Sequence, residues 1–387
     1  MTHSVGFHQY TFPTSNQAYL LIDTGSFLDY ADNRSEAQNF VGSEIEFISE
    51  RVIEGYTRIR GGWNKGGVYT VYFSAEIDTP PEEFGTIKSG KIKINSTSEV
   101  DTGEKTAAFL KFKTAANQKI KMKVGISFLG RLKTRANREN EIVDWNFQEV
   151  IDIAKKKWNN VIRKVRVEGG SEDLKSMFYT ALYHSQLMPS DRSGENPKWA
   201  SNKPYYDDYY AIWDTYRSTN PLLTLINPER HVEIIRSMVD IYEHDGYIPD
   251  GRSGNDNGRT QGGSNSDIVI ADAYLKGLEG IDYEKAYQAM LKNAEVPPGG
   301  NEQKEGRGGL YDYNRIGYIS SDYERAGSRT LEYANNDWAI ASVAKGLGKT
   351  ADFEKYKKRA NNWMSLWRPI EDHGSKGFIW PRNRDGT

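Results

Sequence analysis

Alternating apolar and polar residues predict a β-strand at residues 119–128. Every second residue of this run is apolar: Ile120, Met122, Val124, Ile126 and Phe128. The residues that alternate with them are mostly polar: Lys119, Lys121, Lys123, Gly125 and Ser127. A period of two gives a strand one buried face and one solvated face. Further short strands are predicted at 18–23, 43–53, 67–77, 90–95 and 106–113, separated by Gly, Asn, Asp and Pro. Many short strands with turn signals indicate an antiparallel β-sandwich over residues 1–145.

The apolar pattern changes to a helical period near residue 146. Residues 147–165 carry apolar side chains at helical spacing beside a lysine-rich face, which predicts a linker helix within 146–170. From Ser171, a capping residue, the chain is typical of helices joined by glycine-rich loops up to residue 387. The predicted helices are 172–188, 214–225, 228–244, 266–278, 283–293, 328–346 and 351–367.

Two features interrupt this helical pattern. Pro221 falls inside the helix predicted at 214–225 and is expected to kink or split it. The connection 245–265 is long and polar, which indicates either a functional loop or a disordered one. Its segment 250–258 is rich in oxygen ligands but lacks the spacing and final glutamate of an EF-hand, so we interpret it as a flexible loop without a metal.

Composition excludes several classes of protein. The 51 basic and 53 acidic residues give a net charge of −2, which argues against a nucleic-acid partner. The chain contains no cysteine, so disulfides and thiolate metal sites are excluded. No apolar run reaches the roughly 18–20 residues that span a bilayer, and the N-terminus shows no apolar signal core. We therefore predict no membrane span and no signal peptide in this chain.

Trp213 and Asp214 are the first candidates for chemistry, because an indole face and a carboxylate together suit a sugar. The alternative is a core tryptophan beside a helix-capping aspartate. Arg217 has a structural alternative too, an ion pair with Asp214 along the helix. Trp63 follows two glycines between predicted strands, and is either a turn residue packed on the sheet or an exposed aromatic platform.

The helix at 328–346 carries polar residues among apolar ones. Glu332 and Asn336 share one face at a spacing of four, as do Tyr333 and Asp337. Such faces line the cavity of a helical ring or, alternatively, form a solvated outer surface. Asp267 and Asp272 lie five residues apart and do not share a face.

Six segments follow one another along nearly the whole chain and carry a resemblance jointly. They are IEGYTRIRGGW at 53–63, VYFSAEID at 71–78, VEGGSEDLKSMFYTALYHSQLMPS at 167–190, WDTYRSTNPLLTLINPER at 213–230, GGSNSDIVIADAYLKGL at 262–278 and SRTLEYANNDWAIASVAKGLGK at 328–349. Together they resemble glycoside hydrolase family 92, the calcium-dependent exo-acting α-mannosidases. The resemblance implies an N-terminal β-sandwich, a linker and a catalytic (α/α)6 toroid, with sugar bound between sandwich and toroid.

The resemblance also implies which residues bind substrate. Trp63 would project from the sandwich toward the sugar, and Trp213 with Asp214 would line the sugar site. Gly263, Asn265 and Asp267 would belong to the loop before a helix that faces the pocket.

The chain departs from the family pattern after the helix predicted at 328–346. Family members carry a general acid glutamate in an Asn-Glu-Pro-like segment, and base and calcium-binding groups in a Gly-Asn-Asp-like segment, and neither segment is found before Thr387. About seven helices are predicted after residue 170, whereas an (α/α)6 ring has twelve. We therefore expect an incomplete toroid, the N-terminal portion of a longer parent enzyme, with no catalytic residue or metal ligand of its own.

The resemblance implies that the parent is an inverting α-mannosidase that removes terminal mannose from glycans with the help of calcium. Inverting hydrolysis needs two carboxyl groups about 6.5–9.5 Å apart. We expect this chain to hold a mannose-containing glycan, to bind no calcium and to hydrolyse nothing measurable. The resemblance favours a secreted or periplasmic parent.

Two other functions stay open at this point. A non-catalytic carbohydrate-binding or scaffold protein would bind glycans through residues 1–145, and a glycoside phosphorylase would depend on phosphate. An open ring also leaves apolar helix faces uncovered. We expect exposed Leu, Ile and aromatic residues at 328–346 and 351–367, and association of the chain through these faces.

Overall fold

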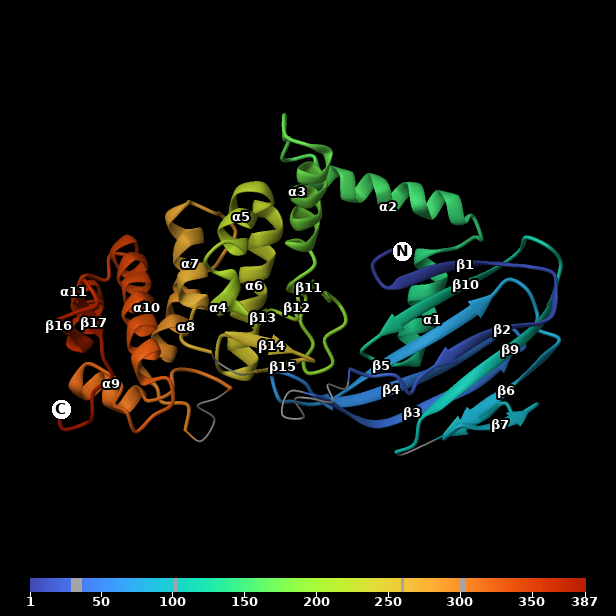
Figure 1. Cartoon of the computed structure of the whole chain (residues 1–387), viewed down its shortest axis with the longest axis horizontal. Helices are drawn as coiled ribbons and strands as arrows, with labels where there is room; N and C mark the ends of the chain where they lie inside the picture. The colour runs from blue at the N-terminus through green and yellow to red at the C-terminus, as the bar shows by residue number, and fades with distance from the viewer. Residues whose placement is uncertain (29–36, 101–102, 259–260, 300–303) are drawn as a thin grey trace. The chain divides into compact units, whose positions relative to one another are not determined.

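The computed structural model describes residues 1–28, 37–100, 103–258, 261–299 and 304–387 (Figure 1). The chain forms two compact units. The first comprises Met1–Arg166 together with Glu195–Lys198, and the second comprises Val167–Gly194 together with Trp199–Thr387.

The first unit contains two antiparallel sheets. The six-stranded sheet has the order β1 (Val5–Phe12), β10 (Gln118–Ser127), β5 (Gly66–Ile77), β4 (Val52–Gly61), β3 (Gln38–Ser49) and β8 (Ser98–Val100). The four-stranded sheet has the order β2 (Ser15–Asp23), β9 (Thr106–Thr114), β6 (Glu83–Lys88) and β7 (Lys91–Ile94). The predicted strand 43–53 is in fact the end of β3 and the start of β4, joined by a turn at Glu50 and Arg51.

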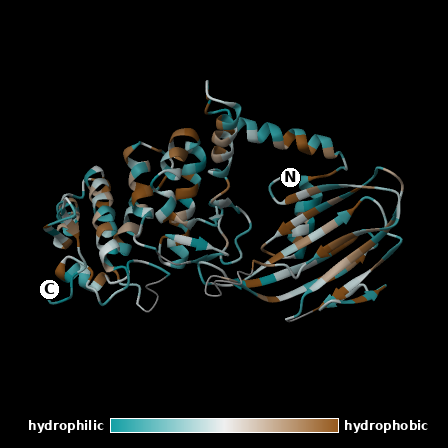
Figure 2. Ribbon diagram, in the orientation of Figure 1, coloured by the Kyte–Doolittle hydropathy of each residue, from teal (hydrophilic) through white to brown (hydrophobic). Residues whose placement is uncertain are grey.

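Apolar side chains from both sheets form one core. Ile45, Ile53 and Ile77 come from the six-stranded sheet, and Leu20 and Leu110 from the four-stranded one, and all five are buried together. Apolar residues recur along the strands of both sheets, as Figure 2 shows. Burial of alternate residues against a facing sheet is what defines a sandwich, so the predicted antiparallel β-sandwich is confirmed.

One part of the sandwich prediction is wrong. Residues 131–141 form a helix, α1 (Arg131–Glu141), within the region expected to be all β. This helix packs on β10 and β5 and covers part of the face of β10 that was expected to be solvated. Lys123 and Ser127 are consequently buried, and burial lowers the pKa of the Lys123 ammonium.

Glu195 belongs to the first unit although it is distant in sequence. Its carboxylate accepts hydrogen bonds from the Ser127 hydroxyl at 2.5 Å, the Phe128 backbone N–H at 3.1 Å and the Asn137 amide at 2.9 Å. A buried carboxylate is tolerated when it is this fully hydrogen-bonded. Glu195 therefore links α1 to the end of β10, although it lies about 30 residues after Arg166, where the continuous part of the first unit ends.

Helices dominate the rest of the chain. After α2 (Phe147–Ile162) of the first unit come α3 (Glu172–His184), α4 (Ile212–Thr215), α5 (Thr219–Ile226), α6 (Pro228–Asp245), α7 (Ser266–Leu275), α8 (Tyr283–Glu295), α9 (Leu310–Ile316), α10 (Ala326–Gly346) and α11 (Thr350–Arg359), then a 3-10 turn, η1 (Asn362–Leu366). The main core of the second unit includes Ile235 of α6, Ile270 of α7, Met290 of α8 and Ile340 of α10.

Three parts of the helical region differ from their prediction. The helix expected at 351–367 ends at Arg359 and is followed by η1 and, from Trp367, by a strand. The helix expected at 214–225 is split, because α4 ends at Thr215 and α5 begins at Thr219. Pro221 lies in the first turn of α5, where its missing N–H leaves no intrahelical bond unmade. Helix α9 was not predicted. It lies between Gly309 and Gly317, both at positive φ, and is too short for periodicity to reveal it.

The interpretation of 250–258 as a flexible loop is wrong. This segment forms β14 (Gly251–Ser253) and β15 (Asp256–Asn257), which pair with each other, and β14 also pairs with β13 (Tyr210–Ala211). Arg252 is fully buried there, with ion pairs to Asp207 at 3.1 Å and Asp245 at 2.9 Å. Buried charges with partners fix a segment in place. Two further short pairs are β11 (Ser190–Asp191) with β12 (Tyr206–Asp207), and β16 (Trp367–Asp372) with β17 (Ser375–Ile379).

In the described ranges, every helix is too short or too polar to cross a lipid bilayer. No membrane-spanning helix is therefore found among the described residues.

Gly55→Ala is expected to destabilise the sandwich. A Cβ at Gly55 of β4 would lie 2.0 Å from the Glu44 carbonyl oxygen of β3, so the paired strands would have to separate. Overpacking of this kind costs about 1–3 kcal/mol. Urea unfolding followed by circular dichroism measures the change. Gly103→Ala is the control because its Cβ would meet nothing within 4 Å, and equal stability of the two variants would contradict the prediction.

Candidate functional site

The carboxylate of Glu332 is the centre of a polar and aromatic cluster in the second unit. It accepts hydrogen bonds from the Trp213 indole N–H at 3.0 Å, the Tyr216 hydroxyl at 3.3 Å and an Arg217 Nη2 at 2.8 Å. Glu332 projects from α10, Trp213 from α4, and the other two donors follow α4 directly. The Glu332 side chain is only 13% exposed, so two segments of the chain, α10 and residues 213–217, meet at one largely buried carboxylate.

Arg217 covers the aromatic members of this cluster. Its guanidinium carbon lies 4.8 Å from the centre of the Trp213 ring and 4.4 Å from that of Tyr216. A guanidinium over an aromatic face is an attractive cation–π arrangement. Arg217 pairs with Glu332 of a distant helix, and the alternative of a local ion pair with Asp214 is wrong.

A Gly-Gly turn allows the chain to approach this cluster closely. A Cβ at Gly262 would lie 3.1 Å from Trp213 Nε1, and one at Gly263 would lie 2.8 Å from Asn336 Oδ1 and 3.0 Å from Glu332 Cβ. No side chain fits in so little space. Glycine is therefore required at Gly263 by packing against α10.

Two buried polar side chains hold the turn. Asp250 accepts the Asn265 backbone N–H at 2.8 Å, and Asn336 accepts the Ser264 backbone N–H at 3.1 Å. The Asn336 amide also donates to Asn265 Oδ1 at 3.3 Å. Burial, with a smaller contribution from the charges of Asp267 and Glu332, raises the pKa of Asp250 to about 7.

Asp267 belongs to a second buried network beneath the turn. It accepts the Ser264 hydroxyl at 2.6 Å and an Arg307 Nη2 at 3.2 Å. Arg307 also pairs with Asp337 at 2.6 Å, and the Tyr313 hydroxyl donates to Asp337 at 2.9 Å. Burial raises the pKa of Asp267 to about 6 even though Arg307 opposes the shift. Asp267 is fully buried, and this geometry assigns it to support of the turn.

Helix α10 thus presents two different polar faces to the interior. Glu332 and Asn336 face α4 and the Gly-Gly turn, whereas Tyr333 and Asp337 face Arg307. Asn336, Tyr333 and Asp337 are buried. The alternative of a solvated outer face is therefore wrong for both pairs.

The structure brings some of the predicted substrate-binding residues together. Trp213, Gly263, Asn265 and Asp267 are linked through Glu332, Asn336 and Ser264. Asp214 is exposed, and its carboxylate makes no hydrogen bond or ion pair with another side chain in the described ranges. Trp63 lies in the first unit, in the turn between β4 and β5, so its approach to the sugar stays a prediction.

Sequence reasoning missed part of the site. Glu332 and Asn336 were recognised as sharing a face, but nothing in the sequence paired them with Trp213 or with the Gly-Gly turn. Asp250 was noticed only as part of an oxygen-rich loop and Arg307 was not noticed, because each lies in a polar, glycine-rich connection and becomes buried only through tertiary packing.

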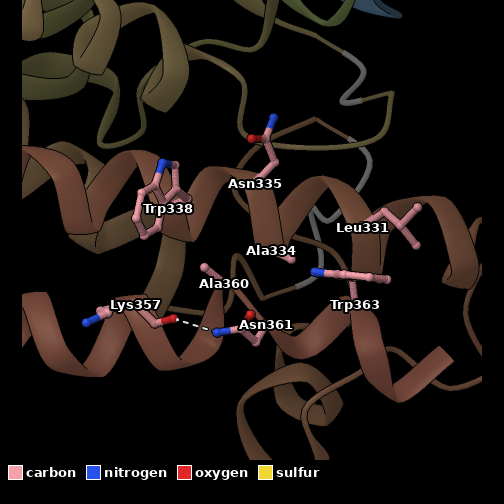
Figure 3. Close-up of a pocket in the computed structure, with 8 residues that line it drawn as sticks. All are labelled: Leu331, Ala334, Asn335, Trp338, Lys357, Ala360, Asn361 and Trp363. Carbon is pink, nitrogen blue, oxygen red and sulfur yellow. Dashed lines mark hydrogen bonds between the residues drawn. The ribbon is translucent and has the colours of Figure 1, made fainter. Parts of the chain in front are cut away.

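A pocket of about 440 Å³ lies between α10 and the segment formed by α11 and η1 (Figure 3). Its lining comprises Leu331, Ala334, Asn335, Trp338, Lys357, Ala360, Asn361 and Trp363. Leu331 and Asn335 of this lining are the neighbours of Glu332 and Asn336 in the sequence of α10. The expectation of exposed apolar residues here is correct for Trp338, which is 53% exposed, but not for Ile340, which is buried.

A calcium site would need several oxygen ligands to converge on one point. Within the described ranges no three His, Cys, Asp or Glu side chains come together in a way that could hold a metal ion. Asp267 and Asp337 are engaged by Arg307, and Asp250 is enclosed by backbone N–H groups. The residues described here therefore do not fit calcium, which prefers six to eight oxygen ligands.

Comparison with known families decides the classification. The model of the glycosyl hydrolase family 92 catalytic domain matches residues 133–387, and that of the family's N-terminal domain matches residues 1–127. The chain belongs to glycosyl hydrolase family 92.

Three relatives of this family 92 chain illustrate the match. A family GH92 inverting mannosidase of Bacteroides thetaiotaomicron superposes with a TM-score of 0.85 at 28% identity, over 99% of this chain and 50% of its own. A family GH92 α-mannosidase of the same organism, in complex with mannoimidazole, gives 0.84 at 26%, over 99% and 49%. An uncharacterized secreted glycosidase of Arthroderma benhamiae is 34% identical over 73% of this chain and 36% of its own length.

These matches confirm the fold class, antiparallel β-sheets followed by a helical domain as in the solved family 92 enzymes. The chain spans about half the length of the two solved mannosidases and about a third of the secreted glycosidase. Membership of the family therefore does not by itself assign the activity of a full-length family member to this chain.

Asp250→Asn is expected to remove a pH dependence of stability. The folded pKa of Asp250, about 7, lies above its ordinary value of 3.8, so its contribution to stability is full below pH 3.8 and falls as pH rises to 7. Within that window the slope is roughly 1.4 kcal/mol per pH unit. The wild type should therefore lose stability relative to Asp250→Asn between pH 5 and pH 8.

Thermal unfolding of both proteins over this pH range measures the difference. Taking the difference between the two proteins cancels the buried His231, whose burial lowers its pKa to about 4 and gives the opposite slope. Parallel curves would contradict the assigned pKa of Asp250.

Proposed function

We propose that an enzyme containing this chain is an inverting α-mannosidase that removes terminal mannose from glycans, and that this chain supplies mannose-binding groups. The observation that carries the proposal is the cluster of Trp213, Arg217 and Glu332 beside the exposed carboxylate of Asp214, within a family 92 fold. Solved family 92 relatives at 26–28% identity are described as mannosidases, one of them with mannoimidazole bound.

Each group of the cluster has a role in this proposal. Asp214 accepts hydrogen bonds from mannose hydroxyls, because its carboxylate is free of other partners in the described ranges and open to solvent. The half-buried Trp213 offers apolar ring surface to the sugar, and Arg217 offers N–H donors. Gly263, Asn265 and Asp267 shape the turn against which this surface is built.

We propose further that the 387-residue chain by itself hydrolyses no α-mannoside. Inversion needs one protonated carboxyl and one carboxylate on opposite sides of the scissile bond. Glu332 is held by three donors, Asp267 and Asp337 by Arg307, and Asp250 is buried, so none of these acts on a sugar directly. Calcium would serve a whole enzyme, because no group of three acidic or histidine side chains in the described ranges could hold the ion.

Two other functions and the location of the protein belong to this proposal. A non-catalytic glycan-binding scaffold is the second candidate, favoured because Glu332, Asp267, Asp337 and Asp250 are all engaged or buried in the part of the chain that the structure describes. A phosphorylase is disfavoured, because no observation in the described residues points to phosphate. The Arthroderma benhamiae relative is described as secreted, which supports a secreted or periplasmic enzyme.

Asp214→Asn is expected to weaken mannoimidazole binding about tenfold, because a hydrogen bond to a charged group is worth roughly 1.5–3 kcal/mol. Isothermal titration calorimetry of the 387-residue chain measures the affinity. Asp173→Asn, an equivalent change at an exposed position on α3, should leave it unchanged. Failure of the wild-type chain to bind mannoimidazole would contradict the proposed sugar site.

Hydrolysis of an aryl α-mannoside is measured on the same preparation with added calcium and with a chelator. We expect no turnover in either condition. Calcium-dependent release of the aryl group by this chain would overturn the proposed inactivity.

A further inference from the structure

We infer that Glu332 is a positioning residue that fixes Trp213 and Arg217 as one preformed sugar-binding surface. This inference rests on the proposed function, because it assigns the surface to a sugar. Glu332 comes from a different helix, 119 residues away in sequence from the indole it binds. No family feature used above assigns it this role.

The geometry restricts both partners. The indole N–H and the Arg217 Nη2 donate to the same oxygen, Oε1, at 3.0 Å and 2.8 Å, while Tyr216 donates to Oε2 at 3.3 Å. Two donors on one carboxylate oxygen fix the angle between the indole plane and the guanidinium. The ion pair is charge-assisted, with the carboxylate 13% exposed and the Arg217 side chain 44% exposed, so solvent screens it on the arginine side.

The exposed part of the cluster is the part that a ligand would meet. The Arg217 side chain is 44% exposed, whereas Glu332 lies beneath it. Guanidinium carries five N–H donors, and the described bonds of Arg217 engage its two Nη atoms with Tyr216 and Glu332. The remaining donors are available to sugar hydroxyls, so the guanidinium adds polar contacts to the aromatic surface of the indole.

The neighbouring Gly-Gly turn confines the Glu332 side chain. A Cβ at Gly263 would lie 3.0 Å from the Glu332 Cβ, and one at Gly262 would lie 3.4 Å from its Cγ. The Gly-Gly turn thus packs directly on the aliphatic part of Glu332. A side chain confined in this way holds its carboxylate in place before a ligand arrives, and preorganisation of this kind increases affinity.

The test uses two variants of the full 387-residue chain. Glu332→Ala removes all three bonds, and Glu332→Gln keeps the shape and one acceptor oxygen but loses the charge that Arg217 requires. The matched control is Glu354→Ala on α11, where the glutamate is exposed. Circular dichroism and unfolding midpoints establish that each variant is folded, and the isosteric Glu332→Gln serves if the alanine variant is not.

The first readout is independent of any ligand. The chain is labelled with 5-fluorotryptophan, and the Trp213 resonance in the ¹⁹F spectrum is identified by its loss in Trp213→Phe. We expect Glu332→Ala and Glu332→Gln to shift or broaden this resonance, while Glu354→Ala leaves it in place. An unchanged Trp213 resonance in both Glu332 variants would overturn the inference, because a positioning residue must alter the group that it positions.

The second readout is the affinity for mannoimidazole. We expect a loss of tenfold or more for Glu332→Ala, a smaller loss for Glu332→Gln and none for Glu354→Ala. If the wild type binds mannoimidazole and the folded Glu332→Ala variant binds it equally well, the inference is overturned and the proposed function stands. Absence of binding by the wild type would overturn the proposed function, and the fluorine spectrum would still decide whether Glu332 orients Trp213.

Discussion

A buried charged side chain without a partner costs several kcal/mol. The second unit avoids this cost by pairing its buried arginines with buried or partly buried aspartates. Arg307 is fully buried between Asp267 and Asp337, and Arg252 is fully buried between Asp207 and Asp245. Three of these four pairs, those of Arg307 and that of Arg252 with Asp207, join segments that are 30 or more residues apart, so the ion pairs also help to determine which loops meet which helices. The Gly-Gly turn owes its place to this network.

The Glu332 cluster also pairs a largely buried charge with its partners, but it lies nearer the surface. Inside the domain, the fully buried carboxylate of Asp267 accepts hydrogen bonds from Ser264 and Arg307, whereas the Glu332 carboxylate pairs with Arg217, which is partly exposed to solvent. The difference in exposure separates groups that hold the fold from groups that are open to a ligand. Helix α10 carries both kinds on adjacent faces, so the shape of the sugar surface and the stability of the core are not independent.

Sequence patterns predicted the features that depend on local spacing. The alternation at Ile120 and Met122 placed a strand correctly, and the cap at Ser171 marked the start of α3. The patterns failed where a later segment decides the environment. Lys123 has the spacing of a solvated residue but is buried by α1, and Arg252 lies in a run of Gly, Asn and Asp that has every local sign of a mobile loop.

The candidate site shows the same division. Trp213 and Asp214 were identified as candidate sugar-binding residues because they are adjacent in sequence. The face shared by Glu332 and Asn336 followed from helical periodicity. Their meeting required the Gly-Gly turn to pass between α4 and α10, which depends on Asp250, a residue 12 positions before Gly262 in a connection without periodicity. Contacts of this kind are set by tertiary packing, and one sequence contains no direct record of them.

The return of residues 195–198 to the first unit has a practical consequence for dissecting this protein. A fragment ending at Arg166 would contain every strand of the sandwich, yet the Ser127 hydroxyl, the Phe128 N–H and the Asn137 amide would lose the carboxylate they share. The boundary of the domain in space is therefore not a boundary in the gene. An isolated sandwich keeps these three hydrogen bonds only if the segment that carries Glu195 is supplied with it.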